Sequence, residues 1–113
     1  MISEEQIIQE FIRVVSRLYP LTGQLLYYCY VKVVGFYVPR LRKRFSYLTI
    51  YCPNELLSAL RSQEEPLKEI AETMELIDVV FIKADNLLRD PMSKLKQENP
   101  RFWLELHWVI SRH

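Results

Sequence analysis

The side chains with the most evident chemical potential are the cations of one stretch in the first half of the chain. From residue 11 to residue 54 the sequence has seven Lys or Arg residues and no Asp or Glu. Ammonium and guanidinium groups gathered in this way attract phosphates, and each phosphate that they neutralise adds a salt-dependent contribution to binding. The sequence therefore predicts contact with nucleic acid, either DNA or RNA, through Lys32, Arg40, Arg42, Lys43 and Arg44.

Charges of the opposite sign are gathered in the next part of the chain. Residues 55–78 contain seven acidic residues and two basic ones. A second interpretation follows, in which the cations of residues 40–44 keep an exposed turn soluble or pair with the acidic surface of the same or a neighbouring chain. This interpretation predicts a protein-interaction module, with a homodimer as one form, that binds no nucleic acid.

The aromatic residues have two interpretations as well. All seven tyrosines lie in the basic stretch, where rings on an outward sheet face could stack with bases. Their commoner role is packing, under the chain's own helices or against a partner subunit. The two tryptophans of the tail likewise complete the core or anchor a partner. We therefore predict a protein interface that includes Tyr28, Tyr30, Tyr47, Tyr51, Trp103 and Trp108.

The sequence offers little for catalysis or for metal binding. His107, His113, Cys29 and Cys52 have no recognised metal-ligand spacing, and thiols with apolar neighbours are poor nucleophiles. Two glycines are too few for a phosphate-binding loop, and the basic half lacks the carboxylates of a metal-dependent nuclease. We predict a protein that is not an enzyme and that uses no cofactor, metal or small-molecule substrate.

The elements that must position these residues begin with a helix. Ser3 and Gln6 form a capping-box pattern, and the helix must end before Pro20. A connector at residues 21–23 then leads to a strand over residues 25–38, which is rich in Tyr and Val.

A hairpin follows from this strand. Gly35 marks a bulge or a bend, residues 39–44 form the turn, and residues 45–52 form the return strand. If Cys29 and Cys52 share one face, that face is the core. The opposite face then gathers Tyr28, Tyr30, Lys32, Tyr47 and Tyr51, although a slip of one residue in the register would reverse the two faces.

The second half reads as helices with a short strand between them. Asn54 caps one helix, and Pro66 lies in the first turn of another. Residues 77–82 form a buried strand, and a short helix follows Asp90. The alternation over residues 102–110 favours a final strand, with a helix as the alternative.

Together these elements predict an α+β fold in a single compact domain of residues 1–113. Its order is α-β-β-α(α)-β-α-β, with a mainly antiparallel sheet of three or four strands and helices on one face. The N-terminus lacks the features of a signal peptide, and no apolar run is long enough to cross a bilayer. With only two cysteines, we expect a cytoplasmic protein with reduced thiols and no membrane contact.

The order of elements between residues 7 and 82 resembles a known family. It runs from a leading helix through residues 33–35 and 47–51 of the hairpin to Leu56–Gln63 and Ile77–Ile82. This pattern is similar to the KH-like domain of the DciA-type loaders of the bacterial replicative helicase, and it covers about two thirds of the chain. The resemblance implies a domain that binds DNA, contacts the helicase and takes part in DNA replication.

The sequence as a whole favours a non-catalytic intracellular adapter. It would bind nucleic acid weakly through the basic hairpin and would contact a protein partner, or a second copy of itself, with another surface. The alternative is the interaction module without nucleic-acid binding, in which the basic hairpin of one subunit meets the acidic surface of another.

Overall fold

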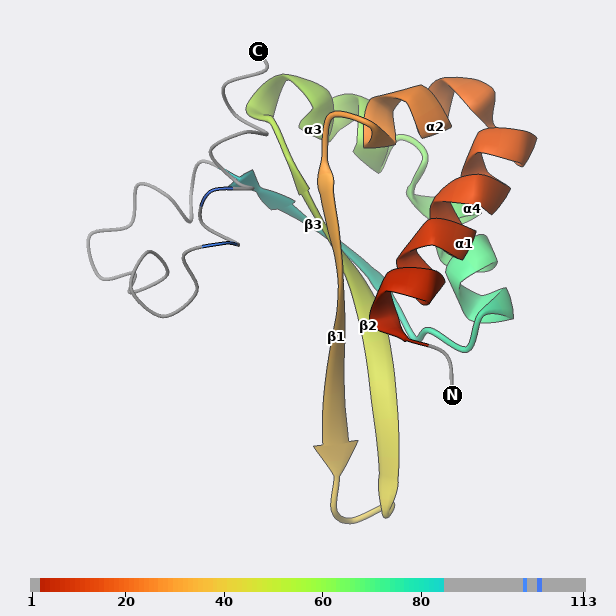
Figure 1. The fold of residues 1–113 in the computed structure, drawn as a ribbon, viewed down its shortest axis with the longest axis vertical. Coiled ribbons are helices and arrows are strands. Elements are labelled where there is room, and N and C mark those ends of the chain that lie inside the picture. The colour runs from red at the N-terminus through yellow and green to blue at the C-terminus, as the bar shows by residue number, and fades with distance from the viewer. Residues whose placement is uncertain (1–2, 85–100, 102–103, 105–113) are drawn as a thin grey trace.

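The computed structural model describes residues 3–84 together with residues 101 and 104. Four helices and three strands follow one another in this part in the order α-α-β-β-α-α-β (Figure 1). The helices are α1 (Glu4–Leu18), α2 (Pro20–Leu26), α3 (Asn54–Arg61) and α4 (Glu64–Thr73). The strands are β1 (Tyr30–Val38), β2 (Lys43–Cys52) and β3 (Val79–Lys83). The predicted α+β class is confirmed.

The sheet is mixed, with the strand order β1-β2-β3. β1 and β2 form the predicted antiparallel hairpin, whereas β3 runs parallel to β2. The expectation of a mainly antiparallel sheet of three or four strands is therefore wrong for β3, and the described residues form three strands. The reason lies in the connection, because α3 and α4 carry the chain back along the sheet, as a parallel crossover requires.

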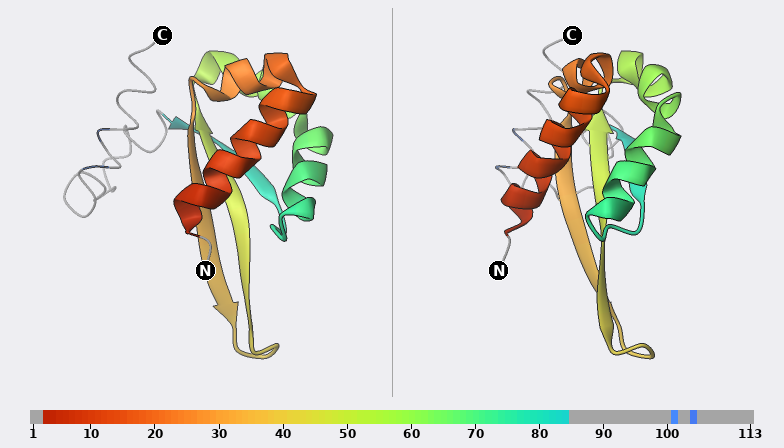
Figure 2. Two further views of the ribbon diagram at one scale, coloured as in Figure 1. Left: turned by 45° about the vertical axis from the view of Figure 1, so that its right-hand side comes forward. Right: turned by 90° about the vertical axis from the view of Figure 1, so that its right-hand side faces the viewer.

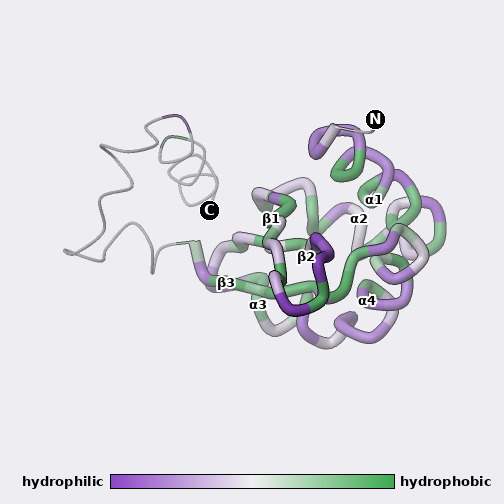
Figure 3. Tube along the Cα trace, turned by 90° about the horizontal axis from the view of Figure 1, so that it is seen from below, coloured by the Kyte–Doolittle hydropathy of each residue, from purple (hydrophilic) through white to green (hydrophobic). Residues whose placement is uncertain are grey.

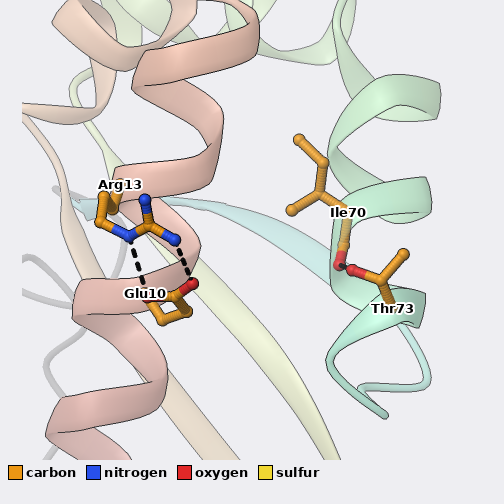
Figure 4. A network of polar contacts seen from close by, with 4 residues as sticks. All are labelled: Glu10, Arg13, Ile70 and Thr73. Carbon is orange, nitrogen blue, oxygen red and sulfur yellow. Dashed lines mark hydrogen bonds and ion pairs between the residues drawn. The ribbon is translucent and has the colours of Figure 1, made fainter.

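The first helix begins as the sequence indicates. The Oγ of Ser3 accepts the N–H of Gln6 at 3.2 Å, and the N–H of Ser3 donates to Oε1 of Gln6 at 2.9 Å, which completes the capping box. An exposed ion pair between Glu10 and Arg13, with 2.6 Å between the charged atoms, lies on the outer side of α1 (Figure 4). The helix ends at Leu18, ahead of Pro20.

The segment after Pro20 differs from the prediction. Residues 21–23 were expected as a connector and residues 25–26 as strand, but Pro20 instead opens the helix α2, which continues to Leu26. Gly23 serves packing here, because a Cβ at this position would lie 2.7 Å from the Cα of Ser16 in α1. The corner between α1 and α2 is therefore tight enough to require glycine, and β1 starts later, at Tyr30.

The core lies on one face of the sheet, between the strands and the four helices (Figure 2). Register pairs Val31 with Ile50 and Val33 with Leu48, and all four side chains are buried. They form one cluster with residues of every helix and of β3, including Phe11, Val15, Leu26, Leu60, Leu67, Ile70, Val79 and Phe81.

The start of α3 and both ends of α4 are set by proline and by backbone geometry. Asn54 was expected to cap α3, but Pro53 holds the cap position and Asn54 is the first helical residue. Pro66 does lie in the first turn of α4. At the other end, Glu75 has a positive φ of 64°, and the N–H of Leu76 donates to the carbonyl of Ala71 at 3.0 Å. This is a Schellman motif, in which glycine is the usual residue at the position of Glu75.

A side-chain bond also closes the last turn of α4. The hydroxyl of Thr73 donates to the carbonyl oxygen of Ile70 at 2.6 Å (Figure 4). It satisfies one of the carbonyl groups that a helix end leaves without a backbone partner.

Most of the tail lies outside the described residues. This applies to the helix predicted after Asp90 and to the predicted interface residues Trp103 and Trp108. Arg101 and Leu104 are described, and both have helical backbone, so the strand predicted over residues 102–110 is wrong at Leu104. Among the described residues no helix is long and apolar enough to span a membrane.

Candidate nucleic-acid interface

The hairpin projects beyond the helices as a two-stranded ribbon, which we call the arm and define as residues 35–46 (Figures 1 and 2). Pairing is regular from Gly35 opposite Ser46 to Val38 opposite Lys43. The bulge or bend expected at Gly35 is therefore absent. In the body half, buried and half-buried side chains alternate in β1 and the last five residues of β2 are buried, whereas Phe36 and Tyr37 in the arm are exposed.

The turn at the end of the arm is shorter than predicted. It comprises residues 39–42, because Lys43 and Arg44 pair in β2 rather than lying in the turn. The N–H of Leu41 donates to the carbonyl of Val38 at 3.1 Å, which places Pro39 at the turn position that favours proline. Arg42 closes the turn with a positive φ of 51°, a conformation that disfavours side chains other than glycine.

Four of the five predicted phosphate-binding residues meet at the end of this arm, and we call them the tip cations: Arg40, Arg42, Lys43 and Arg44. All four side chains are exposed, and none forms an ion pair with a residue that the structure describes. Figure 3 shows the end of the arm from below as a strongly hydrophilic segment.

The fifth predicted residue, Lys32, lies elsewhere. It is half-buried within the body part of β1, opposite Thr49. It lies six residues before Val38 along the strand, which amounts to about 20 Å. The structure therefore brings the four tip cations together and leaves Lys32 apart from them.

The register places aromatic residues on the face of the sheet that points away from the helices, which we call the outer face. It includes Tyr30 opposite Tyr51, Tyr47 opposite Val34, and Lys32. These residues were expected on the face opposite to the core. The four described helices pack on the other face, so they do not cover these rings. Tyr51 is nevertheless only 8% exposed, and burial, followed by the neighbouring Tyr47 and Tyr30, raises the pKa of its hydroxyl.

Tyr28 is not part of this face, contrary to the prediction. It lies in the turn between α2 and β1, where its N–H donates to the carbonyl of Leu25 at 3.1 Å. Its ring packs edge-on against that of Tyr27, with centroids 5.5 Å apart. The reason is the extra length of α2, which delays the start of the strand.

Two aromatic residues of the outer face were missed in the sequence. Phe36 and Phe45 pair across the arm, with ring centroids 5.9 Å apart, and Phe36 lies 6.1 Å from Tyr47. The Nζ of Lys43 lies over the Phe45 ring, 5.7 Å from its centroid. The alternation of β1 continued through Gly35 would have identified Phe36, and that of β2 continued from Tyr47 would have identified Phe45.

An open groove of about 350 Å³ lies on the outer face next to these rings. Asp78 is the one carboxylate among the described residues that line it. This carboxylate forms an ion pair with Lys68 at 3.4 Å and accepts the N–H of Val79 at 2.8 Å. The groove is otherwise apolar or aromatic apart from one threonine, and its lining also comprises Val34, Phe36, Tyr47, Thr49, Tyr51, Ile77, Val80 and Ile82.

The cysteines lie at the body end of the hairpin and are free thiols. Burial raises the pKa of Cys29 to about 12, with a smaller effect of Cys52, and burial raises the pKa of Cys52 to about 11. Both groups are therefore protonated at neutral pH, a state in which a thiol is a weak nucleophile. The described residues contain no group of three or more side chains that could hold a metal ion.

Comparisons of this chain with protein-family models, with curated proteins and with solved structures gave no match. The resemblance to the DciA-type loaders stays a prediction, and the geometry of the arm is the observation that bears on function.

Proposed function

We propose that the protein is a non-catalytic adapter that binds nucleic acid through the tip cations and contacts a protein partner with another surface. The supporting observation is the arm itself, which carries Arg40, Arg42, Lys43 and Arg44 away from the body without a carboxylate partner among the described residues. A projecting ribbon of two antiparallel strands brings its cations within reach of phosphates.

The affinity that this surface can provide is modest. A phosphate contact that releases one counterion contributes a slope of about −0.7 to −0.9 in the logarithm of the binding constant against that of the salt concentration. Four contacts therefore give a slope of about −2.8 to −3.6, smaller in size than that of a protein with about six to ten phosphate contacts.

The protein partner would bind at the end of the molecule opposite to the arm. There the corner of α1 and α2 exposes Leu18, Tyr19 and Leu21, at 59%, 36% and 77% of their surfaces. Clustered exposed apolar side chains are typical of protein contacts. In the terms of the DciA-type resemblance this partner would be the replicative helicase, in the cytoplasm, where thiols such as those of Cys29 and Cys52 stay reduced.

A second candidate function is self-association without nucleic acid. Its supporting observation is a stripe of exposed carboxylates on α4, formed by Glu65, Glu69 and Glu72, which have no ion pair with any described residue. The tip cations of a second copy would complement this stripe.

Fluorescence anisotropy with labelled DNA at several salt concentrations tests the first proposal. The tip variant changes Arg40, Arg42, Lys43 and Arg44 to Gln. The matched control changes four exposed arginines outside the arm to Gln, and therefore removes the same charge: Arg13, Arg17, Arg61 and Arg101. We expect salt-sensitive binding that the control keeps and the tip variant loses.

Two results would contradict the proposal. Equal losses in both variants would mean that total charge, rather than the arm, determines binding. No binding at low salt, together with a molar mass that doubles with concentration in light scattering, would favour the homodimer instead.

A further inference from the structure

The outer face of the arm carries a continuous row of groups that leads from the tip to the body. Lys43 lies over Phe45 at 5.7 Å, Phe45 lies 5.9 Å from Phe36, and Phe36 lies 6.1 Å from Tyr47. The apolar groove begins at Phe36 and Tyr47, and so continues the row toward β3. The three rings Phe36, Phe45 and Tyr47 are called the ring row below.

The opposite face of the arm is different. It carries Tyr37 opposite Arg44 and Gly35 opposite Ser46, so it presents one ring, whereas the outer face of the arm presents two, Phe36 and Phe45, with Tyr47 next to them just beyond the arm. Tyr37 is 54% exposed, more than Phe36 at 39%. The two faces of one ribbon therefore have a similar position relative to the tip cations but a different number of rings.

The distances within the ring row select one type of nucleic acid. Neighbouring bases of a duplex strand are about 3.4 Å apart along the helix axis, and their faces are covered by each other. The rings are 5.9 and 6.1 Å apart, so bases that contact successive rings cannot remain stacked on one another. Only unpaired nucleotides can be spread in this way.

The charges along the row suit the backbone of such a strand. Lys43 stands at the tip end of the row, and Lys32 lies on the same face further into the body. The one carboxylate of the groove, Asp78, is already paired with Lys68. Cations beside stacking rings, with no unpaired carboxylate among the described residues that line the groove, are the combination found in proteins that bind single strands.

We propose that the ring row receives the unpaired bases of a single-stranded nucleic acid, so that the arm binds single strands more tightly than duplexes. This inference depends on the proposed function, because the tip cations must hold the phosphates of the same strand. It adds the class of polymer and the three side chains that recognise it.

The test is fluorescence anisotropy of the full chain with a labelled thymidine oligonucleotide and with a DNA duplex of the same length, at one salt concentration. The ring variant changes Phe36, Phe45 and Tyr47 to Leu, which keeps apolar bulk and removes the aromatic rings. The control is Tyr37→Leu, on the opposite face of the same arm. We expect the ring variant to bind the single strand at least about tenfold more weakly and the control to stay within about twofold.

The outcomes separate this inference from the proposed function. If duplex and single strand bind equally and the ring variant changes neither, the inference is wrong, while loss of binding in the tip variant would still support the adapter. If neither polymer binds the native chain, both proposals fail. If light scattering shows that the native chain is a dimer and that the ring variant is a monomer, the ring row is an interface between two copies and the inference is also wrong.

Cross-linking of the native chain answers the same question without relying on a variant that folds. An oligonucleotide that contains bromouridine is bound to the protein and irradiated, and the residues cross-linked to it are identified by mass spectrometry. We expect attachment to Phe36, Phe45 or Tyr47. Attachment confined to Tyr37 and its face of the arm would overturn the inference.

Discussion

The body half and the arm half of one hairpin differ in what covers them. Both halves have the alternation of a strand and the same regular pairing. In the body, Val33 and Leu48 are 4% and 0% exposed because helices pack over them, whereas Phe36 and Tyr37 in the arm are 39% and 54% exposed. A strand pattern therefore predicts which side chains share a face, but burial depends on what the rest of the chain brings to that face.

The largest expected effect comes from truncating matched residues of β2. Leu48→Ala should lower the free energy of unfolding by about 2–5 kcal/mol, because it leaves a cavity in the core. Phe45→Ala in the arm should lower it by only about 1 kcal/mol, because this ring is partly exposed and contacts Phe36 and Lys43 of the arm rather than the core. Urea denaturation followed by circular dichroism measures both values. Similar losses in the two variants would mean that the arm is part of the folding core.

An intermediate effect on the free energy of unfolding should come from ionisation of the thiols of Cys29 and Cys52 at the body end of the hairpin. Each pKa is higher in the folded protein than its ordinary value of 9.0, about 12 for Cys29 and about 11 for Cys52. Above about pH 9 the unfolded chain therefore releases these protons first. The stability that the neutral thiols provide is complete below that pH and is lost as the pH rises toward 11 and 12.

Urea denaturation across this alkaline range measures the effect. Other groups titrate there too, so the informative quantity is the difference between the native chain and Cys29→Ala, whose stability should decline less steeply with pH. Identical slopes would show that Cys29 ionises equally easily in both states. Alkylation at neutral pH should be slow in the native protein and fast in urea.

The smallest expected effect compares the two positive-φ residues, one in each region. Arg42→Gly in the arm and Glu75→Gly after α4 should each raise the free energy of unfolding by about 0.5–1 kcal/mol, because glycine adopts this backbone without strain. Only Arg42→Gly should reduce the salt slope of DNA binding, by about 1. Melting temperatures and anisotropy check the pair. Weaker binding in Glu75→Gly would place part of the polymer on the body.

Local signals in the sequence predicted local structure well. The capping box of Ser3 and the end of α1 before Pro20 depend on neighbouring residues alone, and both are confirmed. α2 was missed because Pro20 and Gly23 read as helix breakers. Gly23 is required instead by the approach of Ser16, a contact that only the packed corner creates.

Features that depend on distant parts of the chain were predicted less completely. The core face of the hairpin followed from alternation, but the direction of β3 depends on the path of α3 and α4, which composition does not encode. The tip cations were found because they are neighbours in sequence. Within the ring row Tyr47 was predicted on this face. Phe36 was missed because Gly35 was expected to interrupt the alternation of β1, and Phe45 because the alternation of β2 was not followed beyond Tyr47.

The projection of the arm has a consequence for the kinetics of encounter. The whole chain carries a net charge of only +1, so its overall field gives little long-range attraction, and salt screens what remains beyond about 8 Å. The tip lies below every described helix, including the acidic α4, and so meets an approaching polyanion before the repelling carboxylates do (Figure 1). Under the proposed function, the arm would let a nearly neutral protein capture a polyanion at a rate that its net charge would not allow.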